Sequence, residues 1–306
     1  MSLRGAVVGV GYLGQFHAQK YKNNSQVQLV GVCDIFAEQS QKVAQTLGVN
    51  AYSNPRDLIG QVDLVTIAAS TKSHYEMAKL FLSHGVHVNV EKPITETTTQ
   101  AKELIELAQK QNLVFTVGHI ERFNPSLQEL KKRLGSLQSL ELIRHGTYKP
   151  RGADVSVLHD LMIHDIDMMY WLTGSEVSSF EVKGQKLISS EVDSAQASLV
   201  MKNGVKVHIS VSRTAPSPER KVKAYEQGRS FYVNSGDLVI ETCTIDSTQP
   251  SAVKVESAQV EKKDALQAET DAFISAVVQK TQPSLKAEDG LKALDLVEQM
   301  MKKISN

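Results

Sequence analysis

One apolar segment near the middle of the chain carries the residues best suited to proton transfer. Residues 158–173 are apolar almost throughout, which predicts a buried helix. The segment nevertheless contains two histidines and three aspartates: His159, His164, Asp160, Asp165 and Asp167. Burying a charge is costly unless the charge is paired or used. At about 100° per residue, Asp160, His164 and Asp167 are predicted to share one face of the helix.

Three interpretations of this face remain open. Its residues could form a satisfied internal hydrogen-bond cluster. A metal site made by His159, Asp160 and His164 is disfavoured because no third histidine stands nearby, and no metal is expected. In acid–base catalysis, a histidine with a reference pKa of about 6.5 accepts a hydroxyl proton, and a carboxylate one turn away fixes its tautomer.

A glycine-rich turn near the start of the chain has the spacing of a dinucleotide-binding loop. Gly9, Gly11 and Gly14 follow a short apolar run, and Asp34 ends the next one. In such a unit the glycines permit a tight turn, close approach of a pyrophosphate and close packing of the following helix. The later carboxylate accepts hydrogen bonds from a ribose. We therefore expect NAD here rather than an ordinary structural turn.

A lysine follows another predicted strand. Lys92 lies between Glu91 and Pro93, directly after the apolar run 86–90. Ligands of an open α/β sheet bind beyond the carboxyl ends of its strands, and the proline holds this residue outside any helix. A cation at this place would stabilise a developing alkoxide, although a plain surface charge is the alternative.

The first 120 residues must position the glycine turn and Lys92. They alternate apolar runs with helical patterns, which predicts a Rossmann-type doubly wound parallel sheet. The expected strands are 5–10, 27–33, 64–68, 86–90 and 114–117. The expected helices are 13–21, 37–47, 74–83 and 101–111, with Ser73 and the threonine run 97–99 as candidate N-caps.

After about residue 125 the pattern predicts an α+β domain with a large, mostly antiparallel sheet. The expected helices are 126–134, 158–173, 265–278 and 289–304, and the expected strands are 137–147, 195–201, 205–212, 221–225, 230–233, 238–242 and 253–257. The pair Asn203-Gly204 predicts a hairpin. The helix 158–173 can cover only one face of this sheet, so we expect a second subunit on the other. The alternating row expected at that interface is Val205, Val207, Ile209 and Val211.

Length and composition predict an ordinary globular protein of two domains. The chain has 306 residues, with 34 Lys+Arg against 34 Asp+Glu. Its zero net charge gives no reason to expect a nucleic-acid or membrane partner, and we expect a cytoplasmic location. The only cysteines, Cys33 and Cys243, are expected to be buried thiols. We place an NAD-binding domain at 1–120 and a substrate-binding and oligomerisation domain at 121–306, with the last helix, about 289–304, as a candidate to return to the first domain.

The motifs together resemble the glucose-fructose oxidoreductase/inositol dehydrogenase/MocA (Gfo/Idh/MocA) family. They are the glycine turn, Glu91-Lys92-Pro93, Asp160-x-x-x-His164-x-x-Asp167 and the late segments 269–273 and 288–291. The resemblance implies an NAD-dependent dehydrogenase with Lys92, Asp160 and His164 as its catalytic set. The cofactor contacts it implies are Gly9, Gly11, Tyr12, Leu13, Gly14, Asp34, Ser70, Thr71, His74, Glu91 and Lys92. One departure is Ala69-Ser70, where the family usually has Thr-Pro or Val-Pro.

A narrower resemblance lies in the segment 118–125 and in Pro150-Arg151. These residues are similar to the branch that oxidises the 3-hydroxyl of UDP-N-acetylglucosamine. The substrate contacts expected from it are His119, Arg122, Asn124, Lys149 and Arg151. For Arg122 the alternative is a salt bridge to Glu121 or Glu129.

The competing functions are a polyol, inositol or free-sugar dehydrogenase, a reductase running toward the alcohol, and a non-catalytic NAD-responsive sugar sensor. The active site is expected between the two domains, in a homodimer or homotetramer formed through the C-terminal sheet.

Overall fold

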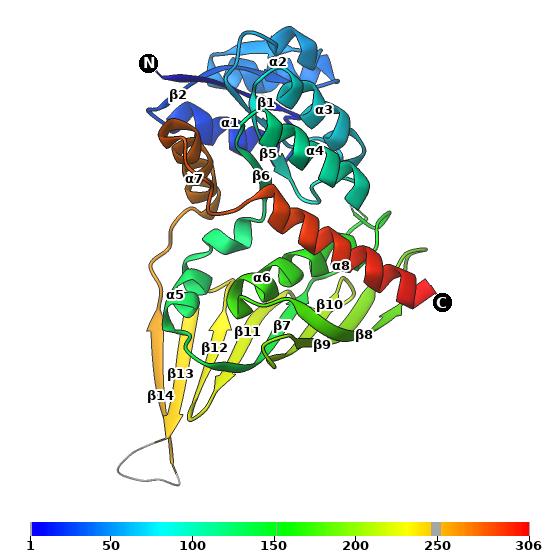
Figure 1. Ribbon diagram of the computed structural model, residues 1–306, viewed down its shortest axis with the longest axis vertical. Coiled ribbons are helices and arrows are strands. Elements are labelled where there is room, and N and C mark those ends of the chain that lie inside the picture. Colours follow the sequence, from blue (N-terminus) through cyan, green and yellow to red (C-terminus); the bar gives the residue numbers. More distant parts are fainter. Residues whose placement is uncertain (1, 151, 246–251, 306) are drawn as a thin grey trace. The chain divides into compact units, whose positions relative to one another are not determined.

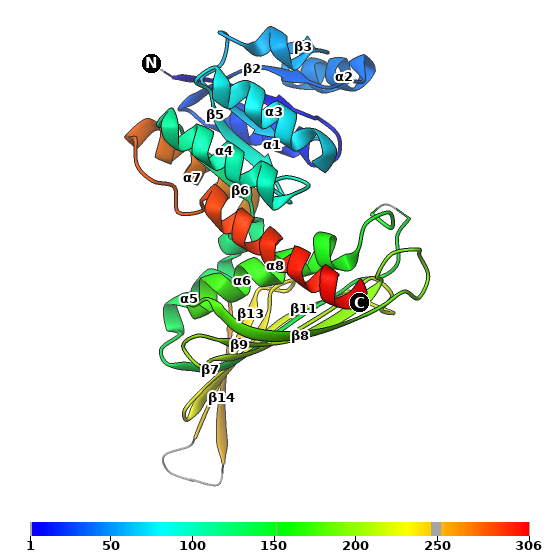
Figure 2. The same ribbon diagram turned by 45° about the vertical axis from the view of Figure 1, so that its right-hand side comes forward.

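The computed structural model describes residues 2–150, 152–245 and 252–305, which form two compact units. The first unit comprises Met1–Ile120 and Leu266–Leu294, and the second comprises Glu121–Ala265 and Asp295–Asn306. Each unit is built on a sheet of its own (Figure 1, Figure 2). Arg151, an expected substrate contact, lies outside the described residues.

The first unit contains a parallel sheet of the expected doubly wound type. Its strands are β1 (Leu3–Val8), β2 (Val27–Cys33), β3 (Asn50–Tyr52), β4 (Leu64–Ile67), β5 (His87–Glu91) and β6 (Phe115–Gly118). They lie in the order β3-β2-β1-β4-β5-β6. The direction of winding therefore reverses beside β1, and ligands of such sheets bind beyond the strand ends at that point. The glycine turn begins directly after β1.

Helices cover this sheet because its strands are apolar on both faces. They are α1 (Gly14–Asn23), α2 (Ala37–Leu47), the short 3₁₀ turn η1 (Pro55–Leu58), α3 (Thr71–Ser83), α4 (Thr98–Lys110), α7 (Ala265–Gln279) and the first part of α8 (Ala287–Ser305). The apolar face of α7 joins α1, β1 and β2 in one core cluster. Thr97 caps α4 in a capping box with Gln100, as expected, whereas α3 begins at Thr71 and Ser73 lies inside it.

The second unit contains a larger sheet. Its strands are β7 (Leu137–His145), β8 (Val177–Gln185), β9 (Ser194–Met201), β10 (Lys206–Ser212), β11 (Glu219–Glu226), β12 (Arg229–Asn234), β13 (Val239–Ile245) and β14 (Val253–Gln259). They lie in the order β14-β13-β12-β11-β7-β10-β9-β8, with β7 and β10 parallel and the other neighbours antiparallel. The hairpin between β9 and β10 turns at Asn203-Gly204, where Gly204 has φ +86°. The predicted fold class is confirmed.

One face of this second sheet lies against helices of the same unit (Figure 1). They are η2 (Ile120–Phe123), α5 (Pro125–Arg133), η3 (Leu158–Met162), α6 (Ile163–Thr173) and the last part of α8. Near its end α8 is fixed by Lys303, whose Nζ lies 4.1 Å from the centroid of the Phe180 ring. No helix within the described ranges has the length and apolarity that a membrane span requires.

The expected interface row is wrong. Val205, Val207, Ile209 and Val211 are 0–4% exposed, because they point into the core toward η3 and α6. Alternation along a strand shows that one side is apolar, but it does not show which side the helices of the same chain cover. The exposed apolar side chains on the other face are Val200, Tyr232, Ile245, Val253 and Val255. Cys243 is also half-buried on that face rather than fully buried.

The segment 158–173 also differs from the expected regular α-helix. Residues Leu158–Met162 form a π-helical turn, and the α-helix begins only at Ile163. A π-turn holds more residues per turn than an α-helix, so angles counted at 100° per residue do not hold across it. Asp160 and His164 are half-buried, whereas Asp167 is 1% exposed and does not share their surroundings.

Candidate functional site

The loop after β1 has the geometry that a dinucleotide requires. Gly9 has φ +81°, and a Cβ there would lie 2.6 Å from the backbone of Ala69. A Cβ at Gly14 would lie 1.8 Å from the carbonyl oxygen of Gly9, so only glycine lets α1 begin this close to β1. A Cβ at Gly11 would meet nothing within 4 Å. The backbone at Gly11 therefore faces open space, as the approach of a pyrophosphate requires.

The first turn of α1 is suited to bind an anion. No side chain caps this helix, and no acidic residue stands in its first turn. Tyr12 and Leu13, which lead into the helix, are 61% and 42% exposed. The first N–H groups of a helix have no partner within the helix, and the helix dipole favours negative charge beside them. These residues fit the pyrophosphate of NAD.

Asp34 is held in place at the end of β2. Its Oδ2 accepts a hydrogen bond from the Val10 N–H at 2.9 Å, and its Oδ1 accepts one from the Phe36 N–H at 3.0 Å. Each carboxylate oxygen has a further lone pair, so a ribose hydroxyl can still donate to Asp34. The next two residues, Ile35 and Phe36, are about 70% exposed and carry no charge. They provide no cation for the extra phosphate of NADP.

Glu91 and Lys92 stand where β5 ends. His17 Nε2 of α1 lies 2.8 Å from Glu91 Oε1, and Glu91 Oε2 accepts a hydrogen bond from the Lys92 N–H at 3.2 Å. Burial would lower the pKa of His17, but the hydrogen bond and charge of Glu91 raise it above its usual value. Both oxygens of Glu91, an expected cofactor contact, thus bind protein groups. Through them Glu91 holds the backbone of half-buried Lys92.

A second buried carboxyl group lies near this pair. Glu269 in α7 is 4% exposed, and its Oε1 lies 3.5 Å from Asn89 Nδ2 in β5. Its Oε2 is buried and has no hydrogen-bond partner among the residues that the structure describes. Burial, and then the charge of Glu91, raise the pKa of Glu269 to about 8. Glu269 therefore holds its proton more tightly than an ordinary glutamate does. Sequence reasoning gave this residue no role, because nothing in the pattern of α7 reveals its distance from Glu91.

The loop after β4 contains the other expected cofactor contacts. His74 is 1% exposed, and its ring nitrogens lie 2.8 Å from the Pro93 oxygen and 3.1 Å from the Ala69 oxygen. Burial lowers its pKa. His74 thus joins this loop to the loop that carries Lys92. Ser70 is exposed, with its hydroxyl 2.9 Å from that of Ser73, and Thr71 opens α3 half-buried.

In the second unit, Asp160 and His164 lie on η3 and α6. A Cβ at Gly152, which has φ +82°, would lie 3.5 Å from Asp160 Oδ2, so the preceding loop runs close to this carboxylate. His159 is half-buried, and burial lowers its pKa. Within the described ranges, no group of three His, Cys, Asp or Glu side chains could hold a metal ion.

Two buried ion pairs hold α6 in place, one and three residues after His164. Arg122 Nε donates to Asp167 Oδ2 at 2.9 Å, and Arg122 Nη2 donates to Asp167 Oδ1 at 2.6 Å. Arg144 of β7 donates to Asp165 at 2.9–3.1 Å and to Glu121 Oε1 at 2.8 Å. All five side chains are at least nine-tenths buried. Arg122 therefore pairs with Asp167.

Sequence reasoning missed Glu121 and Arg144. The signal for Arg144 was its place in the strand: it alternates with Leu140 and Leu142, which point to the covered face. A charged residue at an inward position of a strand requires a buried counter-charge. Two carboxylates of the neighbouring segments supply it.

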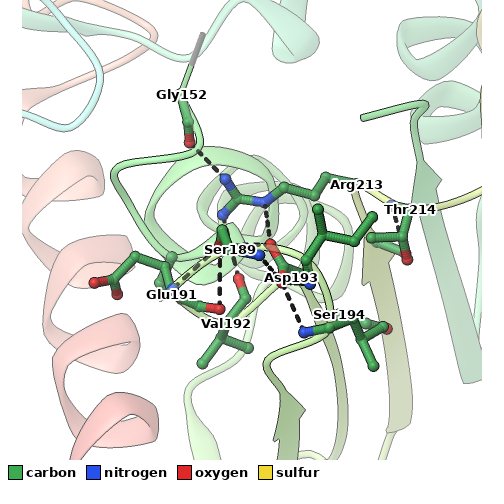
Figure 3. Close-up of polar contacts among 12 residues, drawn as sticks. Gly152, Ser189, Glu191, Val192, Asp193, Ser194, Arg213 and Thr214 are labelled. Carbon is green, nitrogen blue, oxygen red and sulfur yellow. Dashed lines mark hydrogen bonds and ion pairs between the residues drawn. The ribbon is translucent and has the colours of Figure 1, made fainter. Parts of the chain in front are cut away.

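A third buried arginine fixes the loop before η3 (Figure 3). Arg213 donates to the carbonyl oxygens of Gly152 at 2.6 Å, of Val192 at 3.2 Å and of Val155, and its Nε lies 3.5 Å from Asp193 Oδ1. Asp193 Oδ2 in turn accepts backbone N–H groups of residues 187–189 at 2.7–2.9 Å. Burial would raise the pKa of Asp193, but these hydrogen bonds outweigh it and hold the pKa well below its usual range.

The remaining expected substrate contacts occupy different surroundings. His119 is 1% exposed. Asn124 Oδ1 caps α5 by accepting the Ser126 N–H at 3.0 Å, and its Nδ2 donates to the Ser235 oxygen at 3.1 Å. Lys149 is exposed. Of the expected cations that the structure describes in this unit, Arg122 is buried against a carboxylate and Lys149 is open to solvent.

Two family models match separate parts of the chain. Residues 3–119 match the oxidoreductase family with an NAD-binding Rossmann fold, and residues 135–233 match the GFO/IDH/MocA C-terminal domain. UDP-N-acetylglucosamine 3-dehydrogenase of Acidithiobacillus ferrooxidans is 36% identical over 282 residues, which cover 90% of this chain and 88% of that protein. A crystal form of that enzyme superposes with a TM-score of 0.93 at 32% identity, covering 99% of this chain and 98% of the other. Myo-inositol 2-dehydrogenase of Thermotoga maritima is 26% identical, covering 95% of this chain and 93% of that protein.

Proposed function

The chain belongs to the Gfo/Idh/MocA family of NAD-binding oxidoreductases, and we propose that this dehydrogenase oxidises a secondary hydroxyl of a nucleotide sugar. The substrate we favour is UDP-N-acetylglucosamine, oxidised at C3. Similarity along nearly the whole chain to an enzyme of that name supports this choice. Myo-inositol is the second candidate, because a dehydrogenase named for it is also similar along most of the chain.

The proposed chemistry divides between the two units. When bound at the glycine loop, NAD supplies the acceptor for the hydride. His164 takes the proton of the reacting hydroxyl, and Asp160 orients the imidazole. Lys92 places a positive charge at the hydroxyl oxygen and stabilises the negative charge that develops there.

One observation carries this proposal. Asp160 and His164 are only half-buried, so part of their surface is accessible. The next two acidic residues of the segment, Asp165 and Asp167, are instead buried and bound to arginines. A general base must reach substrate and also hold a fixed position. Two buried ion pairs within three residues of His164 supply the fixed position. A sugar sensor without activity has no need of such a base.

The variants His164→Ala and Lys92→Ala test these roles. We expect each to lower kcat at least 100-fold while NADH affinity, measured by fluorescence titration, stays within about three-fold. His84→Ala, which removes an exposed histidine at the C-terminal end of α3, is the matched control and should keep wild-type turnover. Near-wild-type turnover by either catalytic variant would contradict the assignment.

We also propose that a second copy of this chain covers the open face of the large sheet. Tyr232, Ile245, Val253 and Val255 are 36–65% exposed there. Light scattering at micromolar concentration should find a dimer or tetramer, and the double substitution Tyr232→Glu with Val255→Glu should shift it toward the monomer. A wild-type monomer would contradict this proposal.

A further inference from the structure

Arg220, at the start of β11, combines a fixed position with a solvent-accessible guanidinium. We propose that Arg220 binds the diphosphate of the nucleotide-sugar substrate. The assignment rests on the proposed function, since it presupposes a substrate that carries phosphates.

Accessibility separates Arg220 from the other arginines of its unit. The side chain of Arg220 is 58% exposed, whereas those of Arg122, Arg144 and Arg213 are each 9% exposed and bound to buried carboxylates. The side chains of Arg133 and Arg229 are 36% and 37% exposed, and each forms an ion pair with a glutamate near the other end of β11. Arg220 thus has the most exposed side chain of any arginine that the structure describes in this unit. A phosphate can reach it without breaking a buried ion pair.

The backbone of Arg220 is held on both sides. It pairs with Arg144 in the register between β11 and β7, and its carbonyl oxygen accepts the Ser235 N–H at 3.0 Å. The same register places its side chain on the face that η3 and α6 cover, because Val222 and Ala224 follow at alternate positions and are buried. Arg220 therefore projects on the side of the sheet that carries His164.

An ion pair with Glu121 joins the Arg220 guanidinium to the buried ion pairs. Its Nη1 lies 3.6 Å from Glu121 Oε1, the atom that also accepts from Arg144 Nη1. Burial would raise the pKa of Glu121, but the charges of Arg144 and Arg220 together lower it. Arg220, Glu121, Arg144 and Asp165 form a row of alternating charges that ends beside His164.

This arrangement suits a diphosphate. Guanidinium presents five N–H donors in a rigid plane and binds phosphate oxygens in pairs. A contact of 3.6 Å to Glu121 lies beyond hydrogen-bond distance, so the donors remain available while the carboxylate keeps the head group from swinging away. Lys221, the next residue, instead places its ammonium 2.7 Å from Glu219. Its charge is already compensated.

Binding of UDP to the full-length protein, saturated with NADH so that the cofactor site is filled, tests the assignment directly. By isothermal titration calorimetry, Arg220→Gln should weaken UDP binding at least ten-fold, because charge-assisted hydrogen bonds to phosphate are lost. Arg220→Lys should give an intermediate affinity. Arg133→Gln, which removes a half-exposed, carboxylate-paired arginine elsewhere in the unit, is the matched control and should bind UDP as wild type does.

Uridine, which lacks the phosphates, distinguishes recognition from structural damage. Its affinity should be the same in wild type and Arg220→Gln, and with the nucleotide sugar the variant should raise KM at least ten-fold while kcat stays within about two-fold. Equal loss of uridine and UDP affinity, or UDP affinity unchanged from wild type, would overturn the role of Arg220.

Different results would refute the nucleotide-sugar substrate and the role of Arg220. Wild-type protein that binds UDP no better than uridine would overturn the nucleotide-sugar substrate, and the Arg220 assignment with it. Wild-type protein that prefers UDP, together with an Arg220→Gln variant that keeps this preference, would overturn only the assignment to Arg220.

Discussion

The buried pair of Arg122 and Asp167 should be among the costliest contacts of the second unit to break. Asp167 is 1% exposed, and two hydrogen bonds of 2.6 and 2.9 Å join its carboxylate to Arg122. The substitution Asp167→Asn removes the charge while keeping the size of the side chain. It leaves a buried guanidinium without its counter-charge, which typically costs about 3–5 kcal/mol. Because asparagine can still accept one hydrogen bond, we expect about 3 kcal/mol.

The matched control is Glu129→Gln. Glu129 forms an ion pair of 2.8 Å with Arg133, but both side chains are about one-third exposed. Such a pair contributes about 0.3–0.5 kcal/mol, because water screens the charges. Replacing both buried partners at once, by Arg122→Met with Asp167→Leu, should recover much of the loss, since no buried charge remains.

Thermal unfolding followed by circular dichroism, with NADH present, measures these differences. About 2–4 °C per kcal/mol is expected for a unit of this size, so Asp167→Asn should lower Tm by roughly 6–12 °C. Glu129→Gln should lower it by no more than about 2 °C. The turnover of Asp167→Asn should also fall, because α6 carries His164. Equal Tm values for the two variants would refute the view that this pair fixes the helix.

Three further predictions concern the first unit. NADP should bind at least ten-fold more weakly than NAD in a fluorescence titration, because Asp34 would repel the 2′-phosphate; equal affinities would contradict this. Gly14→Ala should abolish NAD binding, since its Cβ would lie 1.8 Å from the Gly9 oxygen, and a variant that binds normally would show that the helix start can shift. Glu269 has a pKa raised from 4.5 to about 8, so the folded state keeps a proton that the unfolded state releases. The free energy of unfolding should therefore fall by about 1 kcal/mol per pH unit between pH 5 and 8. Glu269→Gln should remove that slope in urea titrations, and an unchanged slope would contradict the assignment.

Patterns that depend on neighbours along the chain were predictable from the sequence. Residues 27–33 and 37–47 form β2 and α2 with the expected bounds, since strand alternation, helical spacing and glycine turns are local properties. The roles of Gly9 and Gly14 follow from the absent Cβ alone. Short β3 was missed because three residues carry too little pattern.

Properties that depend on contacts across the fold were not predictable. Arg122 was expected to bind substrate or a nearby glutamate, but its partner Asp167 is 45 residues away. The apolar row of β10 was expected on an interface, but α6 covers it. The π-turn of η3 changes the spacing of Asp160 and His164. In each case tertiary packing selected one of several arrangements that the local sequence permits.

The most direct test of the proposed function is the formation of NADH at 340 nm by the purified full-length protein. UDP-N-acetylglucosamine should support turnover, ideally with an aminotransferase present to consume the ketone. Free N-acetylglucosamine, glucose and myo-inositol should support at least 100-fold lower kcat/KM. Turnover of myo-inositol or a free sugar, with none of the nucleotide sugar, would contradict the proposed substrate.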